Sequence, residues 1–308
     1  CEKMMSNTIE AAKAIVQAQV RTGQLCQIGH QRRSNPRYRQ AMDLAHKQKM
    51  FGRLTHAYGQ WNRGKSEALS WPEKYTMSDE TLKKYGYKSM DEFRNWRWFK
   101  KYGGGPISDL GAHQIDIFNW AFGGTPRSVI ASGGTDFYPE FEMEDNVMAI
   151  YEYDTPEGVA RGYYQVLTTT SSLGFHERFM GIEGTLSISE NPTWNHAYRE
   201  SSADEAKWQE WGKQGLIKKE GAEYEDEKEA VVVDARESPA PDKWDLPVVL
   251  DKAIHQPHLE NFFAAVRGEE ELNCPALEGY KTCVTVKKIK EALDSGCKYE
   301  FKPEDFAV

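Results

Sequence analysis

A glycine-rich turn followed by an acidic and a basic side chain contains the residues best suited to chemistry. The run from Gly103 to Gly105 precedes Asp109, His113 and Asp116. On a helix, side chains four positions apart share a face, so Asp109 and His113 would lie together, with Asp116 three positions further on. A carboxylate one turn from an imidazole can raise its basicity and fix its tautomer, which suits proton transfer near neutral pH. The pattern predicts a proton shuttle beside a ligand. A surface pair, or Asp109 acting only as a helix cap, is the alternative.

Metal and disulfide chemistry are not favoured by the residue pattern. One histidine with two carboxylates has no further obvious ligand, so no metal site is expected. The five cysteines are widely spaced and form no C-x-x-C pair, which argues against a zinc site or a disulfide framework; they are Cys1, Cys26, Cys274, Cys283 and Cys297.

Composition limits the class of protein. The 308 residues are 39% hydrophobic and 28% charged, as in a globular protein that buries a substantial core. A formal net charge of −8 argues against a nucleic-acid binder. No apolar run is long enough to span a bilayer, and the first residues do not form a signal peptide. A cytoplasmic protein is therefore expected.

The chain begins with the pattern that closes an α/β unit. Apolar residues recur at helical spacing between Asn7 and Gly23, and residues 24–29 have the composition of a short strand. A linking helix is expected over 35–50, because Asn35-Pro36 is a typical helix start. The order helix, strand, helix predicts a remnant of a doubly wound domain up to residue 33.

The rest of the chain predicts a large, mostly antiparallel open sheet. Strands are expected over 54–61, 128–133, 146–153, 159–167, 178–182 and 185–189, with a helix over 108–122. Residues 198–245 are highly charged and are expected to run over the surface, with one short helix near 205–211. Two closing helices are expected over about 256–294. The predicted class is α/β, with residues 34–308 forming a substrate-binding and oligomerisation domain.

Five motifs, in order, resemble segments of the Gfo/Idh/MocA oxidoreductases. The run GGGPISDLGAHQIDIFNWAFGGTP, which contains Asp109 and His113, resembles the family's "GG…D.G.H..D…W..G..P" segment. The opening Glu2-Lys3 resembles its Glu-Lys-Pro. The remaining matches are Gly29-His30-Gln31-Arg32-Arg33 with Pro36 and Tyr38, the hairpin Gly181-Ile182-Glu183-Gly184-Thr185-Leu186, and the closing helix from His258 through Gly268.

The resemblance implies a site and a reaction. Lys3, Asp109 and His113 would surround the substrate carbon beside a nicotinamide, with His113 as general base and Lys3 polarising the developing carbonyl oxygen. Asp109 would orient His113 or hold a neighbouring hydroxyl. Glu2 and Lys3 would face the cofactor. The implied substrate contacts are Arg33, Tyr102 and Asp116; for Arg33 a structural ion pair is the alternative.

Two departures from the family pattern matter. Met4 stands where the family has proline, so the backbone turn after the lysine, and with it the position of Lys3, can differ from the family's. No G-x-G-x-x-G occurs in the sequence. The family places about a hundred residues, which form the dinucleotide-binding unit, ahead of its Glu-Lys-Pro. NAD or NADP is therefore the expected cofactor, but its binding to this chain alone is expected to be weak or absent.

The resemblance implies an NAD(P)-dependent dehydrogenase acting on a sugar, sugar derivative or cyclitol, and a homo-oligomer paired through the open sheet. One alternative is a glycosidase that oxidises its sugar transiently and reduces it again. Another is a non-catalytic carbohydrate-binding or dimerisation module. The sequence does not distinguish NAD from NADP, nor one sugar from another.

Overall fold

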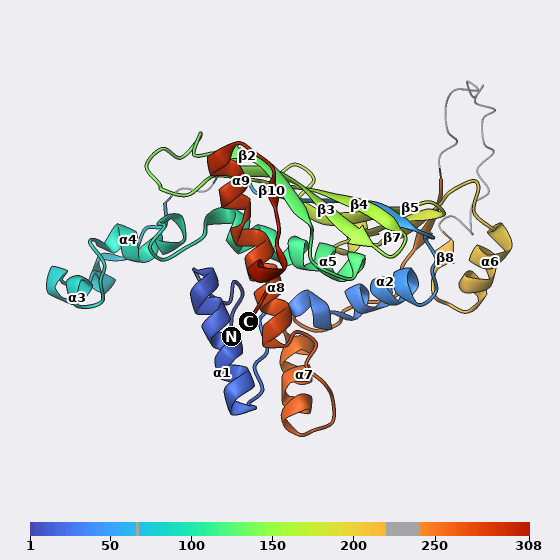
Figure 1. Cartoon of the computed structure of the whole chain (residues 1–308), viewed down its shortest axis with the longest axis horizontal. Coiled ribbons are helices and arrows are strands. Elements are labelled where there is room, and N and C mark those ends of the chain that lie inside the picture. The colour runs from blue at the N-terminus through green and yellow to red at the C-terminus, as the bar shows by residue number, and fades with distance from the viewer. Residues whose placement is uncertain (66–67, 220–240) are drawn as a thin grey trace.

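A ten-stranded sheet forms the centre of the described chain (Figure 1). The computed structural model describes residues 1–65, 68–219 and 241–308. The strands follow the order β10-β2-β3-β4-β1-β5-β6-β7-β9-β8. Their bounds are β1 (Leu54–Asn62), β2 (Ser128–Gly134), β3 (Asn146–Thr155), β4 (Gly158–Leu167), β5 (Phe175–Gly181), β6 (Gly184–Ile188), β7 (His196–Arg199), β8 (Lys218–Lys219), β9 (Asp242–Asp245) and β10 (Tyr299–Glu300).

The first strand lies in the middle of this sheet and is parallel to one neighbour. β1 pairs with β4 in parallel and with β5 in antiparallel orientation. Among the described strands, every other pairing is antiparallel. The prediction of an α/β fold with a large, mostly antiparallel open sheet is therefore confirmed.

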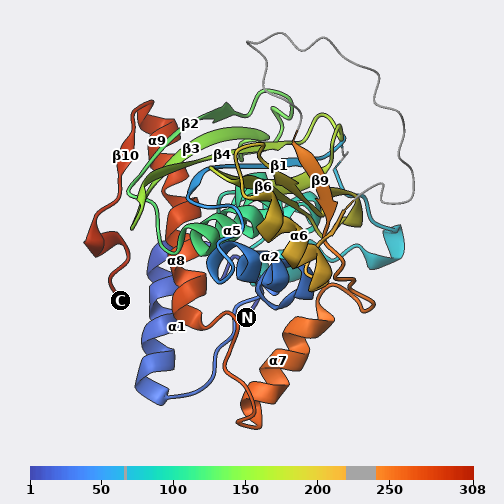
Figure 2. The same cartoon turned by 90° about the vertical axis from the view of Figure 1, so that its right-hand side faces the viewer.

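Alternating burial shows that the sheet has one covered and one open face. In β4, Ala160, Tyr164 and Val166 are buried, whereas Arg161 and Tyr163 between them are partly exposed. This period of two is what a strand with one face on the core requires. Figures 1 and 2 show the helices α2, α5 and α8 on one side of the sheet.

Nine α-helices accompany the sheet in the described residues, with the following bounds: α1 (Ile9–Thr22), α2 (Pro36–His46), α3 (Asp79–Lys84), α4 (Met90–Arg94), α5 (Ala112–Phe122), α6 (Glu205–Lys213), α7 (Gln256–Val266), α8 (Ala276–Lys287) and α9 (Ile289–Ser295). None of them is both long and apolar enough to cross a membrane.

Local capping explains where the first two helices begin and end. The hydroxyl of Thr8 accepts a hydrogen bond from the N–H of Ala11, at 3.1 Å, and so caps α1. α1 ends at Gly23, which has a φ of 64° and closes the helix in the left-handed conformation. The side chain of Asn35 caps α2 in the same way as Thr8 caps α1. The helices predicted at the start of the chain are thus confirmed, with boundaries shifted by a few residues.

Three predicted elements differ from the structure. Residues 24–29 form no strand and make only an isolated bridge, between Gln27 and Pro275, because no described strand lies beside them. The second closing helix is divided at Lys288 into α8 and α9. The helix expected from residue 108 begins as a π-helical turn over Ile107–Gly111, ahead of α5.

The segment 198–245 was predicted to run over the surface, but part of it belongs to the sheet and the core. β7, β8 and β9 extend the sheet, and Trp208 and Trp244 are only 1% and 2% exposed, with ring centroids 6.1 Å apart. These two indoles bury much apolar area from a segment whose charge content suggested solvent. The predicted helix near 205–211 is present as α6. Residues 220–240 of this segment lie outside the described residues.

Buried apolar side chains form two clusters, with α8 contributing to both. The larger fills the space between the sheet and α2, α5 and α9. The smaller lies between α1 and α8. Its members are Met5, Ala12, Val16, Ile28, Cys274, Ala276, Tyr280, Cys283 and Val284. Helix α1 is thereby packed against α8, and whether residues 1–33 form a separate domain stays a prediction.

Candidate active site

The glycine-rich turn is tightly packed against its surroundings. A Cβ at Gly103 would collide with the backbone of Arg97, and Gly105 has a φ of +66°, which favours glycine. The chain then enters the π-helical turn Ile107–Gly111, which presents Asp109 just before α5. Single π-helical turns inside helices are frequent at functional sites. The sequence therefore builds an irregular entry to α5 where the chemistry was predicted.

Lys3 and Asp109 meet although 106 positions separate them. The Lys3 ammonium donates to the backbone carbonyl of Asp109, and its Nζ lies 3.4 Å from Oδ1 of the carboxylate. The Lys3 side chain is only 10% exposed. Burial lowers the pKa of Lys3, and the charge of Asp109 opposes that change. The peptide bond between Lys3 and Met4 is cis.

His113 is held in an aromatic environment. The indole of Trp61 lies against its ring with centroids 5.8 Å apart, and Trp61 itself stacks on Phe175 at 4.5 Å. Nδ1 of His113 is buried and has no hydrogen-bond partner among residues 1–65, 68–219 and 241–308. Burial, reinforced by the positive charges of Lys3 and Arg32, lowers the pKa of His113 well below 6.5. The imidazole is therefore neutral at neutral pH and can accept a proton.

The predicted side-chain pair of Asp109 and His113 is not formed. No hydrogen bond or ion pair joins them in the described structure; the carboxylate of Asp109 instead faces Lys3 and Arg97, at 3.4 and 3.5 Å. The physical reason is the π-helical turn, whose i→i+5 hydrogen bonds rotate positions four apart off a common face. The expectation that Asp109 raises the basicity of His113 is therefore wrong, because the pKa of His113 is lowered.

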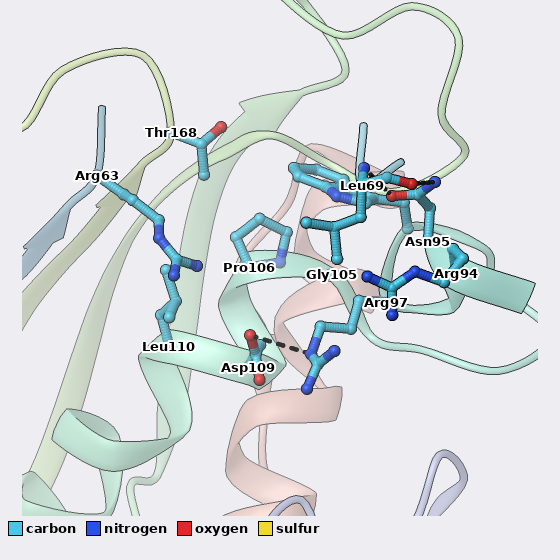
Figure 3. A pocket seen from close by; sticks show the side chains of 11 residues that line it. Arg63, Leu69, Arg94, Asn95, Arg97, Gly105, Pro106, Asp109, Leu110 and Thr168 are labelled. Carbon is cyan, nitrogen blue, oxygen red and sulfur yellow. Dashed lines mark hydrogen bonds and ion pairs between the residues drawn. The ribbon is translucent and has the colours of Figure 1, made fainter. Parts of the chain in front are cut away.

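Two cavities meet at Asp109. The larger has a volume of about 300 Å³ and is drawn in Figure 3. The smaller, of about 170 Å³, is lined by Glu2 and Lys3 together with the glycine-rich turn. Arg97, Gly105 and Asp109 line both. A ligand that passes Asp109 could reach from one cavity into the other.

Tyr102 lines the smaller cavity, but its hydroxyl is already engaged. It donates a hydrogen bond to the carbonyl of Gly86, and the ring stacks on Tyr87 with centroids 4.7 Å apart. Tyr102 thus presents a ring rather than a free hydroxyl to a ligand. Glu2 and Lys3, the residues expected beside the cofactor, occupy the same cavity wall.

Arg33 and Asp116 form an ion pair, and neither residue lines the two cavities at Asp109. The guanidinium of Arg33 donates to both carboxylate oxygens of Asp116 at 2.9–3.1 Å, and Thr282 donates a further hydrogen bond at 2.7 Å. Asp116 is fully buried. Burial opposes its charge, but Arg33 and His30 outweigh burial and lower its pKa. The geometry makes this a buried ion pair that joins residue 33 to α5 and α8, rather than a pair of free ligands.

Arg32 was not selected from the sequence, but it packs on the aromatic rings of Trp61 and Phe175 beside His113. Its guanidinium donates to Glu177 and, at 3.1 Å, to Glu190, and it lies 5.6 Å from the ring centroid of Trp61 and 5.7 Å from that of Phe175. Arg32 is 1% exposed. The run of two arginines was visible in the sequence, but nothing in it showed that their side chains diverge to different carboxylates.

His30 is a second buried histidine near the site that sequence reasoning did not select. Both ring nitrogens are buried without a hydrogen-bond partner in the described residues, and Nδ1 lies 3.9 Å from Oδ2 of Asp116. Burial lowers its pKa to about 4. The only sequence signal was its place in the run Gly29 to Arg33.

No group of three or more His, Cys, Asp or Glu side chains within the described ranges is arranged to hold a metal ion. The same ranges contain all five cysteines, and each of them is free.

The fold and the site together define an α/β protein whose open sheet carries a polar site on its helical face. A model of the GFO/IDH/MocA C-terminal domain matches residues 38–186, so the chain contains a C-terminal domain of the Gfo/Idh/MocA family. A search of curated protein sequences gave no match.

Solved structures with the same fold cover nearly the whole chain. The chain is 17% identical to the WlbA dehydrogenase from Bordetella pertussis, solved with NADH and UDP-GlcNAcA, with a TM-score of 0.62 over 98% of this chain and 70% of that one. It is 16% identical to an aldose-aldose oxidoreductase from Caulobacter crescentus, complexed with glycerol, with a TM-score of 0.67 over 98% of this chain and 71% of that one. It is also 16% identical to levoglucosan dehydrogenase, solved with NADH and levoglucosan, with a TM-score of 0.68 over 97% of this chain and 72% of that one. At these identities the likeness shows the fold.

Proposed function

We propose that this protein acts in an NAD(P)-dependent oxidoreductase that oxidises or reduces a hydroxyl-bearing carbon of a sugar, sugar derivative or cyclitol. One observation carries the proposal: a neutral, water-shielded imidazole, His113, lies within electrostatic range of a buried cation, Lys3, and Lys3 contacts Asp109 where two cavities meet. A proton acceptor beside a fixed positive charge is what alcohol oxidation requires from a protein.

Each side chain has a separate role in the proposed reaction. His113 takes the hydroxyl proton, because its lowered pKa leaves it unprotonated at neutral pH. The ammonium of Lys3 stabilises the negative charge that develops on the substrate oxygen. Asp109 holds Lys3 in place and is free to accept a hydrogen bond from a neighbouring hydroxyl. When bound, the nicotinamide supplies the hydride chemistry.

The residues present fit the reacting end of a nicotinamide cofactor but not its phosphates. Gly29 packs so closely on residues 1–3 that a Cβ there would lie 3.2 Å from the backbone nitrogen of Lys3, so glycine lets these two segments approach each other and set the position of Lys3. No G-x-G-x-x-G is present in the 308 residues. We therefore propose NAD or NADP as the cofactor, held only weakly by this chain alone. NADH is present in two of the structural neighbours.

The test is hydride transfer in the presence of NAD⁺ or NADP⁺ and a panel of sugars and cyclitols. At cofactor concentrations high enough to offset the weak binding, we expect nicotinamide reduction with some of them, and a loss of about 10²–10⁴-fold in kcat for His113→Ala. His255→Ala is the matched control, because His255 is an exposed histidine at the start of α7, away from the open face of the sheet. Unchanged turnover in His113→Ala would contradict the proposal. Release of an aglycone without net reduction would instead indicate a cofactor-recycling hydrolase.

We also propose that the open face of the sheet joins two copies of the chain. A row of side chains crosses five paired strands on this face: Ile130, Ile150, Tyr163, Tyr58 and Arg178. The two isoleucines are 45% and 43% exposed, and the two tyrosine rings stack at 5.6 Å with 17° between their planes. Exposed apolar and aromatic side chains in one row are typical of an interaction surface.

The oligomer is tested by a charge placed in the middle of this row. Ile150→Asp should shift the protein towards a smaller species in sedimentation velocity, because a buried carboxylate opposes association. Ile254→Asp is the matched control, since Ile254 is 44% exposed but lies just before α7, away from the sheet. A monomeric unaltered protein would contradict the proposal.

A further inference from the structure

The larger cavity at Asp109 is cationic, although the protein is acidic. Three arginines line it, Arg63, Arg94 and Arg97, against one carboxylate, that of Asp109. The chain as a whole has a formal charge of −8. A local excess of positive charge in a cavity of an acidic protein raises the local concentration of anions.

The three arginines converge from separate parts of the chain. Arg63 directly follows β1, Arg94 is the last residue of α4, and Arg97 lies in the 3-10 turn Trp96–Trp98. Figure 3 shows their side chains around the same space, with Asp109 below. The remaining walls combine apolar side chains with Asn95 and Thr168.

Hydrogen bonds hold the segment that carries Arg94 and Arg97 in place. The side chain of Asn95 is 3% exposed, accepts a hydrogen bond from the N–H of Leu69 at 2.7 Å and donates to Asp91 at 2.8 Å. The N–H of Arg63 donates to the carbonyl of Leu167 at 2.8 Å. These bonds fix the backbone from which the guanidinium groups project.

Two of the three guanidinium groups have no protein counter-charge in the parts of the chain described. Arg97 lies 3.5 Å from Asp109, but no ion pair or side-chain hydrogen bond is formed by Arg63 or Arg94 with residues 1–65, 68–219 or 241–308. The three cavity arginines are exposed to solvent, whereas the buried arginines Arg32 and Arg33 are each paired with carboxylates. Like charges around one cavity repel each other, and a bound anion removes that repulsion.

From this arrangement we infer that the sugar-type substrate carries an anionic group, a carboxylate or a phosphate, which Arg63, Arg94 and Arg97 bind. The planar guanidinium donates two parallel hydrogen bonds to either group. The anionic group would lie in the larger cavity, and the reacting hydroxyl would reach past Asp109 towards Lys3 in the smaller one. This inference rests on the proposed oxidoreductase function for the reaction, but the anion site is a property of the cavity alone.

The test compares a hexuronate, a hexose phosphate and the neutral hexose of the same configuration, by calorimetric binding and by hydride transfer. We expect kcat/KM for an anionic sugar to exceed that for the neutral one at least tenfold. Arg94→Gln and Arg63→Gln should each weaken anionic-sugar binding about 10–100-fold and affect neutral-sugar binding much less, because a charge-assisted bond to the anionic group is lost. Arg94→Lys should recover part of the binding, since it restores charge without the planar fork.

The control variant is Arg21→Gln, which removes an exposed arginine on α1. Equal turnover of neutral and anionic sugars, with no effect of Arg63→Gln or Arg94→Gln, would overturn the inference and leave the oxidoreductase proposal standing. Arginine-dependent binding of an anionic sugar, without any hydride transfer at saturating cofactor, would support the anion site and contradict the oxidoreductase proposal. Preference for the hexuronate or for the hexose phosphate identifies which anion the site takes.

Discussion

The indole of Trp61 covers the imidazole of His113, with 5.8 Å between ring centroids and 33° between ring planes. Trp61 comes from the middle strand of the sheet and His113 from the start of α5, so this contact is where the sheet and the helical layer meet at the site. The indole excludes water from one side of His113 and therefore contributes to the burial that lowers its pKa.

Removing the indole should make His113 easier to protonate. In Trp61→Ala, water enters, the cost of charging the imidazole falls, and the pKa of His113 rises towards 6.5. A base must be deprotonated to act, so the acidic limb of the kcat/KM profile should move to higher pH. Trp61→Phe keeps an aromatic cover and should move the limb less. An acidic limb at the same pH in all three proteins would show that Trp61 does not shield His113.

Lys3 should affect turnover more than folding. In Lys3→Met the side-chain volume is kept but the positive charge beside Asp109 is lost, and we expect a decrease of about 10²–10³-fold in kcat. Lys3→Arg should recover only part of the rate, because the larger guanidinium cannot take the same position. Lys13→Met, at a half-buried position on α1 remote in sequence from Asp109, is the control. Equal rates in Lys3→Met and Lys13→Met would exclude Lys3 from the reaction.

The ion pair of Arg33 and Asp116 should matter for stability. Asp116→Asn removes the bidentate counter-charge of the buried Arg33 guanidinium and leaves only the longer, 3.5 Å contact with Glu278, so we expect the free energy of unfolding to fall by about 3–5 kcal/mol in urea titrations. The double variant Arg33→Met/Asp116→Leu should recover part of this loss, since it buries no charge. Asp154→Asn breaks the exposed contact with Arg127 and should cost under about 1 kcal/mol. A near-zero effect of Asp116→Asn would refute the structural role.

His30 should make the protein sensitive to acid. Its pKa is about 4 in the folded protein and 6.5 ordinarily, so the unfolded chain binds the proton first as the pH falls. Stability is therefore complete above pH 6.5 and declines as the pH drops towards 4, by about 3 kcal/mol in total from this group. His30→Gln should flatten the decline in urea unfolding across this range. The exposed His255→Gln should not, and identical slopes for all three proteins would contradict the assignment.

The sequence predicted the sheet better than the site. Alternation of apolar and polar residues located six strands, because one face of the sheet is buried and the other is open. The same pattern could not show that β1 pairs in parallel with β4, since the partner lies far along the chain. β7, β8 and β9 are only two to four residues long, too short for alternation to be recognised.

At the site, the sequence located the glycine-rich turn, Asp109 and His113 but not how they are used. Helical spacing assumes 3.6 residues per turn, and the π-helical turn breaks that assumption. Arg63, Arg94 and Arg97 were not selected, because residues on a strand end, a helix end and a turn converge only in three dimensions.

The position of β1 also has a consequence for how the chain is made. Both of its hydrogen-bonded neighbours, β4 and β5, are synthesised roughly a hundred residues after it. A nascent chain that has emerged only as far as residue 157 therefore contains a central strand with two unpaired edges, and such edges are templates for intermolecular pairing. The middle strand of the sheet is therefore made well before either of the strands that pair with it.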